Sequence, residues 1–258
     1  MRSIAILNPK GGSGKTTTTV NLAAALGERE RRVLVVDMDA QGTTTRWFGF
    51  TNPGRNITDI FITERPLVEL VWPTRVLGVA LVPASAWLSG VEKALTWEMK
   101  AVQFFHRSVA SLPAGQWDFL LVDCPPSLGF LTVNTLLGVE EVLVPVEAHY
   151  LALQGVNRVV TVVEALRRHL NPRLRIAGIL ACRVDTRTSH SRDMVRELQR
   201  RFGPLVYQAK IRESVRLAEA ASRHQPITLF DSNSKGAQDY RALAREIMAG
   251  EKEISPKL

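Results

Sequence analysis

A glycine-rich segment with two lysines follows the first apolar run of the chain. Glycines let backbone N–H groups surround a phosphate, Lys15 can reach the β- and γ-phosphates of a nucleotide, and the Thr16 hydroxyl is a ligand for Mg²⁺. The usual loop of this kind begins with glycine, whereas Pro9 or Lys10 stands there, so the loop is a variant. The segment predicts a nucleotide site made by Lys10, Gly11, Gly12, Ser13, Gly14, Lys15, Thr16 and Thr17.

Lys10 is the informative departure from the usual loop. Within one subunit a second lysine adds little, because Lys15 already supplies the positive charge. Lys10 can instead reach a nucleotide bound by a facing subunit, which predicts a homodimer with the nucleotide sandwiched at its interface. A solvated loop lysine is the alternative.

Three aspartates stand where predicted strands end. Asp37 and Asp39 close the second apolar run, and the two-residue period of a strand places both side chains on the same side, towards the loop edge. Asp123 follows Phe119-Leu-Leu-Val, a position suited to hold Mg²⁺ directly or through water. Capping of a strand end is the alternative role for Asp37 and Asp39.

Short apolar runs separated by helical stretches must position these groups. Runs rich in Val, Ile and Leu without polar alternation are typical of strands buried on both faces, and their alternation with helices predicts an α/β fold with a doubly wound, mostly parallel sheet. We expect a single domain over residues 1–258, with 51–73 as the least regular stretch. The predicted strands are residues 4–7, 33–36, 79–82, 119–122, 142–146 and 176–181.

The positive charge is concentrated in the C-terminal part of the chain. Residues 1–150 hold 13 Lys and Arg against 14 Asp and Glu, whereas residues 151–258 hold 20 against 11. This asymmetry favours a polyanion partner, although a merely basic surface is the alternative. Two cysteines and the lack of a leader or long apolar run indicate a reducing, cytoplasmic location.

Residues 191–202 have the pattern of an amphipathic helix with an arginine stripe on one face. Arg192, Arg196 and Arg200 recur every four residues, and Arg187 and Arg216 lie in nearby segments. Aromatic residues are sparse here, so phosphate contacts along duplex DNA are favoured over stacking on single strands. A solvated helix face is the alternative for the stripe.

Several separated motifs together resemble one family. Residues 10–26, 33–42 and 123–129, with 215–220 and 236–240 near the C-terminus, are similar to the deviant Walker-A P-loop ATPases, and most to the short ParA/Soj branch. The resemblance implies a slow Mg²⁺- and ATP-dependent dimerising ATPase that binds duplex DNA non-specifically. It also implies a nucleoid-associated protein that positions a chromosome, plasmid or protein organelle, with hydrolysis stimulated by a ParB-like or other adaptor.

The resemblance also implies roles for individual residues. Lys10 would cross to the other subunit's phosphates, Asp39 would position or activate the attacking water, and Asp37 would support the metal site or a switch loop. Lys10, Lys15 and Asp39 would thus be catalytic, Thr16, Asp37 and Asp123 would serve the metal, and Arg187 and Arg216 would contact DNA. Residues 211–214 depart from the family's adenine-side loop, so purine preference is an expectation only.

Three other ATPase classes compete with this interpretation. A MinD-like membrane-associated ATPase needs a C-terminal amphipathic helix, but residues 249–258 lack an apolar face and contain Pro256. An iron–sulfur reductase needs more cysteines than Cys124 and Cys182. A ligase of the dethiobiotin-synthetase kind leaves Lys10 and the basic surface unexplained. Because the chain starts at its first strand, we expect no N-terminal helix-turn-helix domain.

Overall fold

The computed structural model describes residues 1–95, 98–148 and 152–250, and these residues form an eight-stranded sheet. The order of the strands across the sheet is β3-β4-β2-β5-β1-β6-β7-β8, and every pair is parallel except β3 with β4. The strands are β1 Arg2–Ile6, β2 Val33–Asp37, β3 Trp72–Pro73, β4 Val79–Val82, β5 Phe119–Asp123, β6 Glu141–Glu147, β7 Arg175–Val184 and β8 Val206–Arg212.

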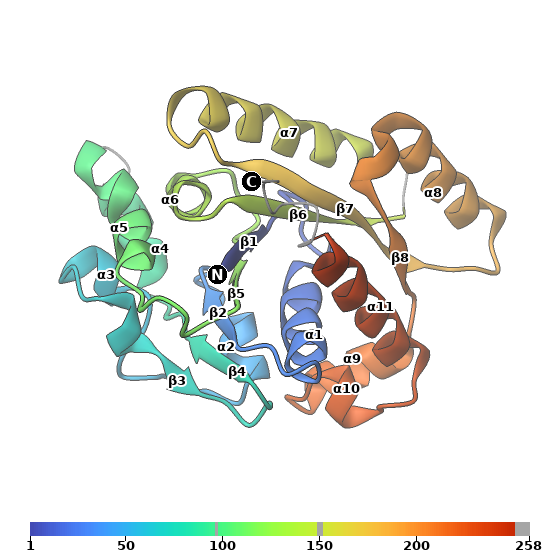
Figure 1. Cartoon of the computed structure of the whole chain (residues 1–258), viewed down its shortest axis with the longest axis horizontal. Coiled ribbons are helices and arrows are strands. Elements are labelled where there is room, and N and C mark those ends of the chain that lie inside the picture. Colours follow the sequence, from blue (N-terminus) through green and yellow to red (C-terminus); the bar gives the residue numbers. More distant parts are fainter. Residues whose placement is uncertain (96–97, 149–151, 251–258) are drawn as a thin grey trace.

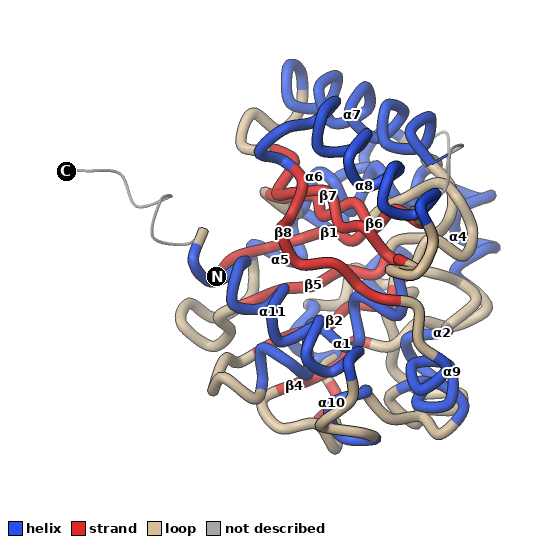
Figure 2. The backbone as a smooth tube through the Cα atoms, turned by 90° about the vertical axis from the view of Figure 1, so that its right-hand side faces the viewer, coloured by secondary structure: helices blue, strands red, loops and turns tan. Residues whose placement is uncertain are grey.

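Helices cover both faces of this sheet. In Figure 1, α7 and α8 lie along one face of β6 and β7, while α1 and α11 lie on the other, and Figure 2 shows the strands between the two helical layers. The helices are α1 Lys15–Gly27, α2 Thr43–Trp47, α3 Asp59–Ile62, α4 Leu88–Leu95, α5 Phe104–Ala110, α6 Phe130–Gly138, α7 Ala152–His169, α8 Ser189–Phe202, α9 Val215–Ser222, α10 Ile227–Phe230 and α11 Lys235–Ala249, with 3₁₀ turns η1 Leu67–Leu70, η2 Met99–Gln103 and η3 Gly203–Leu205.

All six predicted strands are present, which confirms the doubly wound α/β fold. The inner strands β1, β2 and β5 consist almost entirely of fully buried residues, because helices press on both of their faces. Each face of the sheet carries its own apolar core, one under α3 to α8 and one under α1 and α9 to α11. The stretch 51–73 holds only the short elements α3, η1 and β3, as expected.

Two strands were not predicted, and both lie at sheet edges. β3 has two residues, one of them Pro73, and so offers no apolar run. β8 alternates buried and more exposed residues along much of its length, because one of its edges faces solvent and the end of α11 rather than another strand. Neither resembles a strand that is buried on both faces.

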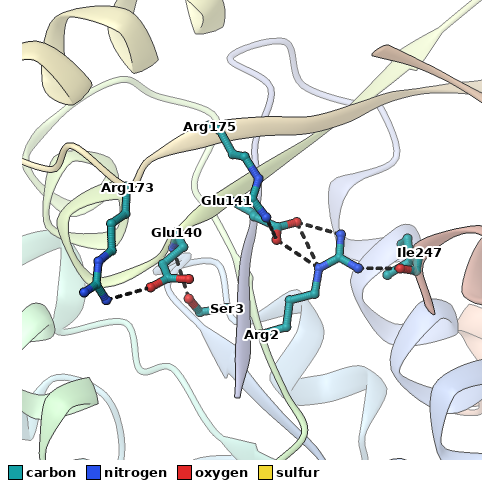
Figure 3. Close-up of polar contacts among 7 residues, drawn as sticks. All are labelled: Arg2, Ser3, Glu140, Glu141, Arg173, Arg175 and Ile247. Atoms are coloured by element: carbon teal, nitrogen blue, oxygen red, sulfur yellow. Dashed lines mark hydrogen bonds and ion pairs between the residues drawn. The ribbon is translucent and has the colours of Figure 1, made fainter. Parts of the chain in front are cut away.

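A cluster of ion pairs fixes the amino-terminal edge of the sheet, the edge opposite the glycine-rich loop. The Glu141 side chain is 2% exposed and lies between the guanidinium groups of Arg2 (2.7 Å) and Arg175 (2.6 Å), as Figure 3 shows. Arg2 also donates to the backbone carbonyl of Ile247 in α11. A buried carboxylate needs such pairing, so this cluster ties β1, β6 and β7 to the last helix.

Candidate nucleotide-binding site

The glycine-rich loop links the end of β1 to the start of α1. Gly12 (φ 74°) and Gly14 (φ 93°) have left-handed backbone conformations that favour glycine, and Gly14 is the residue directly before α1. The Asn8 side chain accepts the Lys10 N–H (2.9 Å) and donates to the Pro145 carbonyl (2.7 Å). The sequence thus bends the loop over the amino-terminal end of α1 and ties it to β6.

The loop is well suited to hold phosphate. The Ser13 hydroxyl is buried and has no hydrogen-bond partner within the part of the chain that the structure describes, so it can donate a hydrogen bond to a phosphate oxygen. Together with the free N–H groups and positive dipole of the α1 terminus, this hydroxyl forms an anion site. The predicted phosphate-binding residues 10–17 therefore lie together in one loop and the first turn of α1.

Lys15 is the buried cation of the loop. The residue is 8% exposed, and its ammonium donates to the Lys10 carbonyl at 3.4 Å. Burial lowers the pKa of Lys15, and the negative charges of Asp123 and Asp39 oppose this shift. A triphosphate at the loop would add negative charge beside this buried ammonium and accept its hydrogen bonds.

Thr16 and Asp123 meet where a magnesium ion would be held. The Thr16 hydroxyl donates to Asp123 Oδ2 at 2.7 Å, and the Thr44 hydroxyl donates to the same oxygen at 2.7 Å. No group of three His, Cys, Asp or Glu side chains that could hold a metal occurs among the described residues. A magnesium ion here would therefore complete its six oxygen ligands with phosphate and water, as Mg²⁺ commonly does.

Asp37 and Asp123 are direct neighbours on β2 and β5, and both are buried. Burial raises the pKa of each; the Asp123 charge raises that of Asp37 further, while the Thr44 and Thr16 hydroxyls limit the rise at Asp123. Asp37 accepts the N–H (2.8 Å) and hydroxyl (2.6 Å) of Thr45 and the N–H of Asp39. It anchors the start of α2, and its role at the metal stays a prediction.

Asp39 stands in the turn after β2. Its Oδ1 accepts the Gln41 N–H at 2.9 Å, so the capping role set out as the alternative is present. Its charge also helps to keep Lys15 protonated, because it opposes the fall in the pKa of that residue. Its role in positioning water stays a prediction.

In the single chain, the Lys10 side chain does not point into the phosphate-binding loop. Its ammonium pairs with Glu147 Oε2 at 3.1 Å, and the side chains are 40% and 25% exposed. Glu147 was not among the residues predicted from the sequence, although a carboxylate at the end of a predicted strand was the same signal that singled out Asp37 and Asp123. Thr44 and Thr45 were not predicted either; their hydroxyl groups donate to Asp123 and Asp37, respectively.

A pocket of about 810 Å³ opens beside the loop and offers room for the rest of a nucleotide. Its lining joins Gly12, Gly14 and Thr17 to the ends of β7 and β8. The segment 211–214, which departs from the family pattern, forms part of this wall. Purine preference stays a prediction.

The five predicted DNA-contacting arginines are all engaged within the chain. Arg187 pairs with Asp185 at 2.9 Å, and Arg216 pairs with Asp231 (2.8 Å) and Glu219 (2.6 Å). On α8, the partners of the stripe are the Thr186 carbonyl for Arg192, Asp193 for Arg196 and Glu197 for Arg200. Acidic residues thus offset part of the stripe's charge, while the Arg187 side chain is 86% exposed beside the pocket.

The chain is similar to known proteins along its whole length. Residues 1–176 match a family described as AAA domain. The chromosome partitioning protein ParA of Myxococcus xanthus is 38% identical, covering 99% of this chain and 91% of that protein. The sporulation initiation inhibitor protein Soj of Bacillus subtilis is 37% identical, covering 95% and 98%.

A solved structure extends the likeness to three dimensions. A cobyrinic acid a,c-diamide synthase from Mycobacterium smegmatis with bound ATP analog and magnesium superimposes with a TM-score of 0.85 at 31% identity, covering 98% of this chain and 96% of that one. These findings confirm the resemblance that the motifs indicated. The chain belongs to the ParA/Soj family of P-loop ATPases.

Proposed function

We propose that this chain is a Mg²⁺- and ATP-dependent ATPase that dimerises around ATP, holds duplex DNA without sequence preference and positions a chromosome, plasmid or protein organelle. The observation that carries the proposal is the contrast between its two loop lysines. Lys15 is buried in the cradle, whereas Lys10 lies outside it on an exchangeable ion pair with Glu147. A lysine so placed can serve a nucleotide on a facing subunit.

The hydrolysis step needs positioning and charge neutralisation more than covalent chemistry. Lys15 and the Ser13 hydroxyl hold the phosphates, and Thr16 and Asp123 hold Mg²⁺, which neutralises phosphate charge when bound. Asp39 orients the water that attacks the γ-phosphorus. Lys10 from the facing subunit stabilises the charge of the transition state, so hydrolysis is slow until an adaptor completes this arrangement.

The DNA surface belongs to the dimer in this proposal. Arg187 and Arg216 leave their acidic neighbours for phosphates, and α8 adds longer-range attraction. The chain acts as a single domain over residues 1–258, in the cytoplasm and on the nucleoid. A ParB-like or other adaptor then stimulates hydrolysis and releases the DNA.

Light scattering tests the dimer directly. With Mg²⁺ and a non-hydrolysable ATP analogue the wild-type chain should be a dimer, and with ADP it should be a monomer. Lys10→Ala should leave substantial monomer with the analogue, while Lys93→Ala, an exposed lysine on α4, should behave as wild type. A wild-type chain that stays monomeric with saturating analogue and Mg²⁺ would contradict the sandwich.

Two alternatives have clear tests. Membrane association of the MinD kind predicts ATP-dependent flotation with liposomes. No described helix is long and apolar enough to cross a bilayer. Most of the C-terminal tail that such a protein would use as its membrane anchor, residues 251–258, lies outside the described residues. The name of the Mycobacterium smegmatis synthase motivates the other: an amide-forming ligase would turn over ATP only with a carboxylic acid and a nitrogen donor. ATP hydrolysis stimulated by DNA and an adaptor, with neither substrate present, would separate the two functions.

A further inference from the structure

Four side chains of alternating charge run from the glycine-rich loop to the turn after β8. Lys10 pairs with Glu147 Oε2 (3.1 Å), Arg183 pairs with Glu147 Oε1 (3.2 Å), and Arg183 pairs with Glu213 Oε1 (3.4 Å). We call these four residues the charge row. Glu147 is its centre, because each of its carboxylate oxygens carries a different cation.

The backbone places the members of the charge row with little freedom. Asn8 ties the Lys10 N–H to the β6 strand, which ends at Glu147. Glu147 lies opposite Cys182 in the β6–β7 register, so Arg183 is the next residue along β7. Arg183 has a left-handed φ of 52°, and the Glu213 N–H donates to the neighbouring Val184 carbonyl at 3.2 Å. The row therefore joins the glycine-rich loop to the ends of β6, β7 and β8.

We propose that Glu147 is a positioning residue that holds Lys10 on its own chain and competes for it with the nucleotide of a facing subunit. Arg183 makes the exchange easier, because it keeps Glu147 paired after Lys10 has left. This inference rests on the proposed ATP-bound dimer. It adds a reason why dimerisation responds to the triphosphate: Lys10 exchanges one anion for another with a higher charge.

Substitutions of Glu147 and of Arg183 should have opposite effects on the dimer. Glu147→Gln removes the competitor and frees Lys10, so the dimer should become tighter. Arg183→Gln removes the cation that stays behind, so the departure of Lys10 leaves a partly buried carboxylate unpaired and the dimer should become weaker. A part-exposed ion pair changes an equilibrium constant by about 1.4- to 5-fold. The two pairs of a dimer together should change its dissociation constant by roughly 2- to 30-fold.

Sedimentation equilibrium with Mg²⁺ and a non-hydrolysable ATP analogue measures these effects as dimer dissociation constants. We expect a roughly 2- to 30-fold decrease for Glu147→Gln and an increase for Arg183→Gln. In a Lys10→Ala background, Glu147→Gln should change the constant by less than about 1.4-fold, the lower limit for one pair. If the effect of Glu147→Gln requires Lys10, Glu147 acts by positioning Lys10 and not through a general structural role. Thermal unfolding of each variant checks that it is folded.

The outcomes distinguish this inference from the function on which it rests. A wild-type chain that fails to dimerise overturns both. A wild-type dimer with an unchanged or weakened Glu147→Gln dimer overturns the competition alone. An equal effect of Glu147→Gln with and without Lys10 also overturns it, because the carboxylate would then act through another contact.

Discussion

The two lysines of the glycine-rich loop have different surroundings, and these surroundings define different tasks. Lys15 is buried near Asp39 and Asp123, where its charge is fixed in place for a phosphate. Lys10 reaches away from the loop towards Glu147 and stays partly in water. A fixed cation suits binding within one subunit, whereas a cation on an exchangeable pair suits contact with another.

Asp39 can be tested separately as a cap and as a catalytic group. Asp39→Ala should keep ATP and DNA binding but lose turnover by about 100-fold or more, because the water is no longer positioned. Asp39→Asn is the matched variant, since its amide oxygen can still accept the Gln41 N–H. Single-turnover hydrolysis and nucleotide titration measure the two properties.

The two variants give different answers if Asp39 is only a cap. Turnover restored by Asp39→Asn would assign the effect of the alanine variant to the turn. Loss of ATP binding in Asp39→Ala would show that the residue belongs to the binding site and not to the water.

The Asp37 and Asp123 pair should make stability depend on pH. Both pKa values are raised on folding, so between about pH 4 and neutrality the folded chain binds more protons than the unfolded chain. Their contribution to the free energy of unfolding therefore falls as pH rises through that range. Asp37→Asn should remove much of this fall.

Urea unfolding of the nucleotide-free chain with EDTA checks this prediction. From pH 5 to pH 8 the stability of Asp37→Asn relative to wild type should improve by about 1–3 kcal/mol. Asp118→Asn is the control, because Arg32 lowers the pKa of that part-exposed carboxyl, which is therefore ionised in both the folded and the unfolded chain from pH 5 to pH 8 and should add no pH dependence there. Parallel pH curves for wild type and Asp37→Asn would contradict the raised pKa.

At the scale of elements, helix α11 completes the edge strand β8. Glu246 accepts the N–H groups of Gln208 (2.8 Å) and Ala209 (2.9 Å), and Asp239 accepts the Arg212 N–H at 2.9 Å. An edge strand exposes unpaired N–H groups that invite pairing with other chains. These two carboxylates occupy them and so protect the edge.

Removal of this protection should destabilise the chain. Glu246→Ala should lower the free energy of unfolding by about 1–3 kcal/mol, because one N–H that it satisfied is part-buried. Glu164→Ala on α7 is the control, since its ion pair is exposed and should change stability by no more than about 0.5 kcal/mol. Equal effects of the two substitutions in denaturant unfolding would contradict the edge role.

The sequence predicted the inner strands well because burial on both faces leaves continuous apolar runs, as in β2 and β5. It missed β3 and β8, whose edge positions permit Pro73 and polar alternation. Helix α8 begins at Ser189 and not at residue 191, because Thr188 caps it. The local sequence therefore indicates which strands are buried on both faces, but it does not indicate which helix packs beside an edge strand.

In the candidate site, too, the sequence predicted the residues that have a local signal and missed the pairs that the fold brings together. The contiguous loop 10–17 and the strand-end carboxylates were evident, because their chemistry depends on residue type and local position. The Lys10–Glu147 pair joins residues 137 positions apart, and Arg216 pairs with Asp231 in the turn after α10. Such pairs depend on the fold and have no local signal.

At the scale of the whole molecule, DNA binding should depend on dimerisation and salt. Random duplexes should bind tightly with Mg²⁺ and ATP but weakly with ADP, because the dimer doubles the number of arginines that face DNA. Arg187→Ala or Arg216→Ala removes two phosphate contacts per dimer, so the slope of log affinity against log salt should fall by about two. Titration at several salt concentrations measures this slope.

Arg196→Ala is the comparison for that experiment, because α8 adds only longer-range attraction in the proposed function and Arg196, like the other two arginines, has an acidic neighbour. It should change the slope less than Arg187→Ala does, and ATP-driven dimerisation should stay intact in all three variants. Equal affinity with ATP and ADP, or a strong preference for one duplex sequence, would contradict the proposed use of this surface.

The place of β1 in the sheet also governs when the chain can fold as it is synthesised. β1 is made first, yet its neighbours are β5 (Phe119–Asp123) and β6 (Glu141–Glu147), and Arg2 finds its last partner at Ile247. At a translation rate of about 5–20 residues per second, β1 waits roughly 6–23 s for β5 to be made. The nascent amino-terminal segment thus carries an unpaired apolar strand through that interval, and we expect a chaperone that binds apolar segments to protect it.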